Sequence, residues 1–361
     1  MSDQVYKDMI DVMNKRGAVF GGMDIPEFYR VVKALFTPEE AEINNAMPKR
    51  IFTAAEMASQ MGKDEAEMAT TLKSMADKGL CHSHLKDGAR VFRAVPFVPG
   101  IFEFVFYRGT TTDRDKELAK YIYEYKEAWE AKSPITMPFP TMRVITVDKT
   151  VEVGNKIHTY DQVKSYIEKN DTIAVGRCYC RHAALLRGED THGMPLDTCM
   201  FFGRNADFGI NCLGARKMTQ AEGLQLLDEC EEAGLVHQTQ NVTDEISYLC
   251  NCDRWHCYAI KLTLKQPKPS AMLNSGFEPR FDPDLCAACE TCIDRCPVEA
   301  LTMGDDDLPQ VDLNRCFGCA VCATGCPNEA IKMVSKPGFE EPPKDQKALM
   351  GAVVASFSSQ G

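Results

Sequence analysis

Apolar residues recur with helical spacing over the N-terminal part of the chain. Residues 1–36 follow this spacing, and a later stretch places Met68, Leu72 and Met75 on one face of a helix. Such a face is buried against a core, while the opposite face meets solvent. The pattern therefore predicts several amphipathic helices that pack together in the first third of the chain.

Local signals define the elements that follow. Thr53 and Glu56 have the spacing of a capping box, and Asp64 is placed to cap the next helix. Two short extended segments then flank Asp87-Gly88, a dipeptide typical of a two-residue hairpin turn. Two helices followed by a hairpin are elements of a winged helix, so we expect a helical and winged-helix-like region over residues 1–95.

A winged helix can bind DNA, but the second helix of this one is acidic. It carries four acidic residues against two lysines: Asp64, Glu65, Glu67, Asp77, Lys73 and Lys78. The whole chain has a net charge of −11, whereas phosphate binding needs clustered Lys and Arg. We therefore expect a structural or docking role here and no nucleic acid partner. A redox-sensing DNA-binding regulator is the less favoured hypothesis.

A long helix and a region of mixed structure are expected next. Residues 113–132 place Leu118, Ile122, Tyr125 and Trp129 on one stripe of a helix. Beyond it, the pattern predicts strands over three segments, residues 143–148, 172–176 and 235–239, and a helix capped by Thr219 and Glu222.

Two cysteine runs near the C-terminus carry the strongest chemical signal. Each reads C-x2-C-x2-C-x3-C-P, and every position of one lies thirty residues from its partner in the other. The first run is Cys286, Cys289, Cys292 and Cys296, followed by Pro297, and the second is Cys316, Cys319, Cys322 and Cys326, followed by Pro327. This is the ligand run of a bacterial two-cluster ferredoxin, in which thiolates hold the iron.

The fourth cysteine of each run has a special place in such ferredoxins, because it binds the other cluster. That rule assigns one [4Fe–4S] cluster to Cys286, Cys289, Cys292 and Cys326, and the second to Cys316, Cys319, Cys322 and Cys296. Zinc and disulfides are the alternatives. Disulfide frameworks suit small secreted domains, and the doubled pattern of eight cysteines disfavours both.

Nine further cysteines lie upstream of these runs, of the 17 in the chain. We interpret Cys81 and Cys230 as core residues, and Cys212 is left open. A third iron–sulfur cluster is the leading interpretation of the rest, with Cys178, Cys180, Cys250 and Cys252 as the best four ligands and Cys199 and Cys257 in reserve. Each C-x-C pair is expected to offer two thiolates from one turn. Reduced core thiols and a redox-active dithiol are the alternatives.

The expected fold class is α+β and multidomain. Its parts are the region 1–95, a connector with the long helix over 96–140, a Cys-rich mixed α/β middle domain over 141–265, a bacterial two-[4Fe–4S] ferredoxin-like domain over 270–336 and a tail over 337–361. Hydrophobic residues make up 44% of the chain, and no apolar run approaches the roughly 20 residues that span a bilayer. The N-terminus shows no secretory signal, so we expect a cytoplasmic protein without a transmembrane segment.

Taken together, these segments resemble a family of anaerobe proteins described as 4Fe–4S dicluster-domain, or ferredoxin-like, electron-transfer proteins. The resemblance covers most of the chain and is carried by five blocks besides the two cysteine runs: residues 96–103, 172–182, 195–199, 232–238 and 249–252. In relatives the segment after Cys-Asn-Cys is richer in cysteine than residues 253–257 are here. The resemblance implies electron delivery within a larger redox assembly.

The expected function is therefore that of an iron–sulfur electron-transfer subunit in an anaerobic redox complex. Its partner would be a protein such as a flavoprotein or a molybdenum or tungsten oxidoreductase. The chain has no Gly-x-Gly-x-x-Gly fingerprint and no P-loop, and no catalytic residue is assigned. The alternative is an iron–sulfur enzyme with an open iron site in the middle domain.

Overall fold

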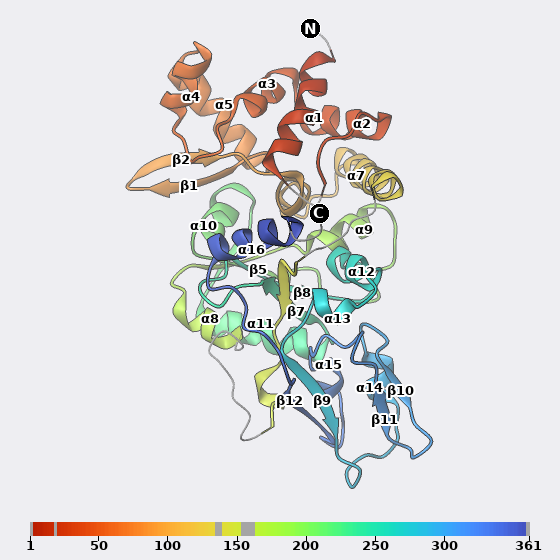
Figure 1. Ribbon diagram of the computed structural model, residues 1–361. Coiled ribbons are helices and arrows are strands. Elements are labelled where there is room, and N and C mark those ends of the chain that lie inside the picture. The colour runs from red at the N-terminus through yellow and green to blue at the C-terminus, as the bar shows by residue number, and fades with distance from the viewer. Residues whose placement is uncertain (1–2, 18–19, 134–138, 153–162, 359–361) are drawn as a thin grey trace. The chain divides into compact units, whose positions relative to one another are not determined.

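The computed structural model describes residues 3–17, 20–133, 139–152 and 163–358. The chain is a mixture of helices and strands and divides into two compact units, which are described one at a time with the labels of Figure 1. Unit 1 comprises Met1–Ile135, Ala174–Asp190 and Arg204–Lys217, and unit 2 comprises Thr136–Ile173, Thr191–Gly203 and Met218–Gly361.

Unit 1 is mainly helical. Its helices are α1 (Gln4–Arg16), α2 (Pro26–Leu35), α3 (Pro38–Ala46), α4 (Ala54–Met61), α5 (Glu65–Asp77), α6 (Phe102–Phe104), α7 (Asp113–Lys132), α9 (Tyr179–Leu186) and α10 (Gly203–Cys212). Strands β1 (His82–Lys86) and β2 (Ala89–Arg93) form a hairpin, and β4 (Ile173–Gly176) neighbours β6 (Arg216–Met218) in a sheet. Segment Phe97–Ile101 is a turn with non-helical backbone angles at Val98, Pro99 and Gly100.

The local signals of the N-terminal region act as predicted. Thr53 and Glu56 form a complete capping box at α4, and Asp64 accepts hydrogen bonds from two backbone N–H groups at the start of α5. Asp87 and Gly88 both adopt positive φ, as a two-residue hairpin turn of the right twist requires. These contacts confirm the elements α4, α5, β1 and β2, while their description as a winged helix stays a prediction.

The core of unit 1 is aromatic. Helix α7 spans the predicted residues, and its Tyr125 packs with Phe28 of α2, Phe97 and Phe102, whose ring centroids lie 5.8–6.3 Å from its own. Helix α9 also contributes, because Tyr179 stacks on Phe106 at 6.0 Å. Burial of these rings joins segments that are far apart in the sequence.

Unit 2 contains an antiparallel sheet in the order β3-β7-β8-β5. The strands are β3 (Met142–Val144), β5 (Cys199–Phe202), β7 (Val236–Gln240) and β8 (Tyr248–Cys252). The helices of this part are α8 (Val163–Lys169), α11 (Gln220–Glu232), α12 (Tyr258–Leu264) and α13 (Pro269–Met272). Thr219 and Glu222 cap α11 as predicted, while β3 is shorter than expected because a 3-10 turn follows at Asp148–Thr150.

The C-terminal part of unit 2 is built from two interlocked halves. Its strands and helices are β9 (Phe277–Phe281), α14 (Thr291–Arg295), β10 (Leu301–Met303), β11 (Pro309–Val311), α15 (Val321–Thr324) and β12 (Ile331–Ser335), and α16 (Gln346–Ser358) follows in the tail. β9 pairs with β12 and β10 pairs with β11, so each half gives one strand to each hairpin-like pair. The two cysteine runs occupy equivalent loops between these strands.

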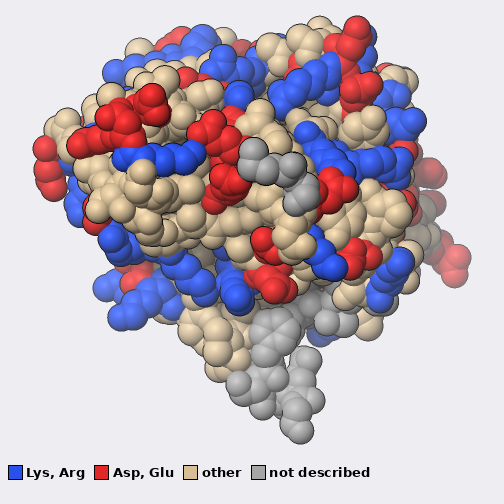
Figure 2. All heavy atoms as spheres, turned by 90° about the horizontal axis from the view of Figure 1, so that it is seen from above, with Lys and Arg blue, Asp and Glu red and all other residues tan. Residues whose placement is uncertain are grey.

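The two lysines of the acidic helix that was expected in the winged helix are both paired with carboxylates. Lys73 of α5 pairs with Asp77 at 2.5 Å, and Lys78 pairs with Glu40 at 2.7 Å. In the view of Figure 2, basic side chains alternate with acidic ones over the visible face. This arrangement adds to the argument against phosphate binding by α5. In the described part of the chain, no helix has the length and apolar character needed to cross a membrane.

Candidate metal centre

Segment 277–335 repeats the same hydrogen bonds at a spacing of thirty residues. The backbone N–H of Ala300 donates to Sγ of Cys296 at 3.2 Å, and that of Ala330 donates to Sγ of Cys326 at 3.3 Å. The fourth cysteine of each run thus has the same N–H···S contact. Such contacts stabilise a thiolate and tune a cluster that it binds.

The repeat extends to the strand ends. The N–H of Asp282 donates to the carbonyl of Ala330, and the N–H of Asp312 donates to the carbonyl of Ala300, each at 2.8 Å. Both bonds join one half of the segment to the other. The halves are therefore related by an approximate twofold, which the spacing of the cysteines requires.

Four cysteines line one cavity in this segment. They are Cys286, Cys289, Cys292 and Cys326, three from the first run and the fourth from the second. Most of the other lining residues are apolar, among them Phe281, Met303, Pro309, Pro327 and Ile331, and three are polar: Glu290, Thr291 and Asn328. Four thiols around an apolar cavity suit a thiolate-bound cluster, because the apolar wall limits access of water.

The other four cysteines gather in the same crossed manner. Cys296 lies close enough to Cys316, Cys319 and Cys322 for its charge to affect all three. Burial, with the neighbouring thiols, raises the pKa of Cys316 to about 11 and also raises the pKa of Cys319 and of Cys322. Four neighbouring thiols, three of them buried, can then become thiolates together only if a cation such as iron offsets their charge.

The two sets differ in exposure. Cys289 of the first set is exposed, and a hydrogen bond from Thr291, whose Oγ1 lies 3.4 Å from Sγ, lowers the pKa of its thiol. In the second set Cys319 and Cys322 are buried. A centre in the first set would therefore lie nearer to solvent than one in the second.

A family of known proteins matches this segment. The model of the 4Fe-4S binding domain family, Fer4, matches residues 279–302, which include the whole first cysteine run. The matched residues belong to an iron–sulfur ferredoxin-like domain, and that name is used below for segment 277–335, which carries both cysteine runs. The match supports at least one [4Fe–4S] cluster and a role in electron transfer. No curated protein and no solved structure matches the chain.

Two small residues shape the cluster loops of the ferredoxin-like domain. Gly318 has φ +71°, and a Cβ there would overlap the carbonyl of Phe277. Glycine is needed at position 318 because the backbone there lies close to β9, a contact that the sequence did not reveal. Ala288, the equivalent residue of the first run, adopts φ +48° as well, so the first loop keeps the same backbone without glycine.

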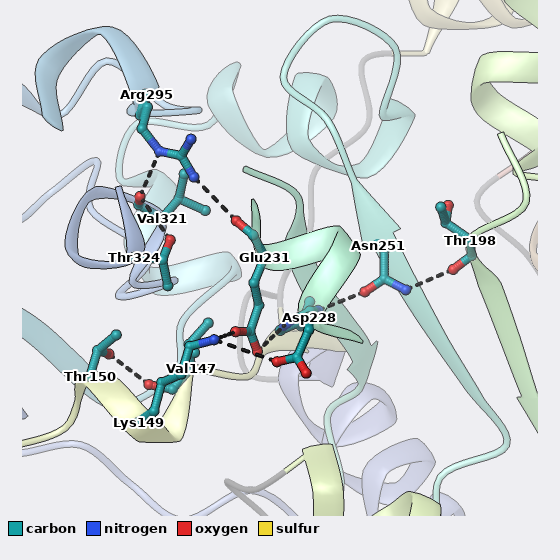
Figure 3. Close-up of polar contacts among 11 residues, drawn as sticks. Val147, Lys149, Thr150, Thr198, Asp228, Glu231, Asn251, Arg295, Val321 and Thr324 are labelled. Atoms are coloured by element: carbon teal, nitrogen blue, oxygen red, sulfur yellow. Dashed lines mark hydrogen bonds and ion pairs between the residues drawn. The ribbon is translucent and has the colours of Figure 1, made fainter. Parts of the chain in front are cut away.

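Arg295 attaches the ferredoxin-like domain to helix α11. Its guanidinium donates to the carbonyls of Glu231 and Val321, each at 3.2 Å (Figure 3). It also donates to the carbonyl of Glu232 at 3.3 Å. Glu231 also pairs with Lys149 through its carboxylate. Arg295 directly precedes Cys296, so these bonds fix the position of that ligand candidate.

Three upstream cysteines come together within unit 2. Cys250 and Cys252 lie on strand β8 rather than in the expected turn, and the thiol of Cys252 is within hydrogen-bonding reach of those of Cys250 and Cys257. Cys199 begins β5, and the register of Met200 with Leu249 sets it opposite Cys250. The strand went unrecognised because Cys-Asn-Cys lacks the apolar alternation of a typical strand.

The other two predicted ligands belong to unit 1. Cys178 is the N-cap residue of α9, and Cys180 lies in its first turn. The charges of Cys180 and Lys126 interact, and Lys126 also reaches the hydroxyl of Tyr179. The predicted set of four thus takes two residues from each unit. Cys81 and Cys230 are fully buried, which confirms their interpretation as core residues.

Among the described residues, no three His, Cys, Asp or Glu side chains converge as ligands of a single metal ion. The cysteines of the ferredoxin-like domain share this property. Each thiolate of a cluster binds a different iron, so cluster ligands stand apart around a cavity. The first crossed set, which lines a cavity, has this arrangement.

Proposed function

We propose that this protein transfers electrons through two [4Fe–4S] clusters in its ferredoxin-like domain, as a subunit of a larger anaerobic redox complex. One cluster is held by Cys286, Cys289, Cys292 and Cys326, and the other by Cys316, Cys319, Cys322 and Cys296. The observation that carries the proposal is the cavity lined by three cysteines of one run and Cys326 of the other. Bound clusters supply one-electron oxidation and reduction.

The greater exposure of the first cysteine set indicates which cluster site a redox partner would approach. Cys289 is exposed, and so are Asp282, Asp284 and Glu290 around the same loop. An acidic surface steers a partner that carries a basic patch. The first cluster is therefore the one that exchanges electrons with a redox protein, such as a flavoprotein or a molybdenum or tungsten oxidoreductase.

A third iron–sulfur cluster in the middle domain belongs to the proposal, with Cys178, Cys180, Cys250 and Cys252 as its predicted ligands. The contact of Cys252 with Cys250 and the buried Lys126 near Cys180 support it, because a nearby cation favours the thiolate form. A cytoplasmic location remains an expectation from the sequence.

Iron and acid-labile sulfide, counted per chain after anaerobic purification, test this function. Two four-iron clusters give about eight irons and three give about twelve. Cys319→Ser should remove about four irons, while Cys81→Ser, a buried thiol of unit 1, should remove none. A protein that holds no iron and sulfide under these conditions would refute the proposed function.

A further inference from the structure

We propose that Cys257 is a ligand of the middle-domain cluster and forms a three-thiolate set with Cys250 and Cys252. This inference rests on the proposed function and deepens it, because unit 2 would supply three of the four ligands that a [4Fe–4S] cluster takes. The register of β5 with β8 sets a further thiol of the same unit, Cys199, opposite Cys250 on this face.

The sheet presents Cys250 and Cys252 on one face. Side chains alternate along a strand, and Asn251 between them points to the opposite face. There its amide donates to the carbonyl of Thr198 at 2.7 Å and its Oδ1 lies 2.6 Å from Nδ1 of His237 (Figure 3). These buried contacts hold β8 in register, so both thiols are fixed on the other side.

Gln238 shows that Cys257 lies over that same face. Gln238 pairs with Cys250 in the β7–β8 ladder, and directly opposed residues of antiparallel strands share a face. Its amide Nε2 donates to Sγ of Cys257 at 3.9 Å. The three thiols and one hydrogen-bond donor to sulfur are therefore gathered on one side of the sheet.

A tight turn returns the chain to this position. Oδ1 of Asp253 accepts the N–H groups of Trp255 at 2.8 Å and His256 at 2.6 Å, and Oδ2 lies 3.2 Å from Nδ1 of His256. Asp253 is buried, so its hydrogen bonds are shielded from water and hold the loop in this conformation. It brings Cys257 back within reach of Cys252.

The same loop is joined to the second ferredoxin cluster site. Arg254 donates to the carbonyls of Cys296 and Asp294, each at 3.3 Å, and pairs with Glu299 at 2.7 Å. Cys252 and Cys257 also belong to the buried core that contains four cysteines of the ferredoxin-like domain: Cys292, Cys296, Cys319 and Cys322. The three-thiolate set thus lies next to a candidate electron carrier, within one unit.

The test compares Cys257→Ser with Cys230→Ser in the full chain, both purified anaerobically. Both thiols are buried in unit 2, so the control matches the burial of the changed residue. We expect about twelve irons in the parent protein and in Cys230→Ser, and about eight in Cys257→Ser, whose spectrum should keep only the ferredoxin clusters. Twelve irons and an unchanged spectrum in Cys257→Ser would overturn the inference.

A second variant covers the case in which Cys257→Ser does not fold. Gln238→Leu keeps every thiol but removes the donor to Cys257, and hydrogen bonds to sulfur raise a cluster's potential. We expect the iron content to stay the same and the potential of one of three clusters to fall. An unchanged set of potentials would contradict the inference, and so would a parent protein with about eight irons, which leaves the two ferredoxin clusters intact.

Discussion

Replacement of Gly318 by alanine should selectively damage the second ferredoxin cluster site. The residue has φ +71°, and its carbonyl accepts a hydrogen bond from Ser275 Oγ at 2.7 Å. A Cβ at this position would lie 2.9 Å from the carbonyl carbon of Phe277 and closer still to its oxygen. The backbone of β9 would have to move, because a carbonyl cannot rotate away as a side chain can.

Three costs contribute to the expected loss of stability. The left-handed conformation costs alanine about 1 kcal/mol relative to glycine. The displaced contact with Ser275 removes one buried hydrogen bond, worth about 1 kcal/mol. Overpacking against Phe277 adds about 1–3 kcal/mol, so the whole effect is about 3–5 kcal/mol.

Ala288→Gly is the matched control, because Ala288 occupies the equivalent place in the first run at φ +48°. Glycine would remove the conformational strain of alanine at this positive φ, but it would also increase the conformational entropy of the unfolded chain. The two effects oppose each other, so the change in stability should be near zero. The assay is the rate at which cluster absorbance bleaches in urea, together with the iron retained. Equal bleaching of Gly318→Ala and Ala288→Gly would refute the reasoning from the Phe277 contact.

Three further changes test other parts of the molecule. Cys326→Ser should leave the same residual EPR signal as Cys289→Ser, because Cys326 lines the cavity of the first cysteine run. A residual signal that matches Cys319→Ser instead would contradict the crossed assignment. Lys149→Met should lower the urea midpoint by an amount equivalent to about 1 kcal/mol, since it removes one partner of the Glu231 carboxylate and leaves the other, His237, while Lys149 itself is half exposed; an unchanged midpoint would show that the pair adds no stability. Burial lowers the pKa of His82 to about 3, so the contribution of this residue to the free energy of unfolding is complete above about pH 6.5. In urea titrations this contribution should fall by about 2 kcal/mol by pH 5, because the unfolded chain binds the proton first. His82→Leu should flatten this dependence.

The elements that the sequence predicted correctly depend on local chemistry. Thr53, Asp64 and Thr219 each cap a helix through contacts that reach no farther than three residues along the chain. The spacing of the first cysteine run is local in the same sense, and it lies within the segment that matches the 4Fe-4S binding domain family. Such signals need no knowledge of the rest of the fold.

The parts that were not predicted depend on partners distant in sequence. Cys-Asn-Cys forms a strand because β7 and β5 flank it, and nothing within Tyr248–Cys252 indicates those neighbours. Likewise Tyr179 joins unit 1 through Phe106, about seventy residues upstream. The proximity of Cys257 to Cys252 required the turn at Asp253, whose role appears only when its two N–H partners are known.

The interlocked strands of the ferredoxin-like domain have a consequence for its biosynthesis. β9 pairs with β12, and the cavity around the first cysteine run includes Cys326, which leaves the ribosome forty residues after Cys286. Neither site can be complete while the second half is still being synthesised. We therefore expect iron to be inserted only after translation of the domain, so that a nascent chain interrupted between the two runs carries no finished cluster.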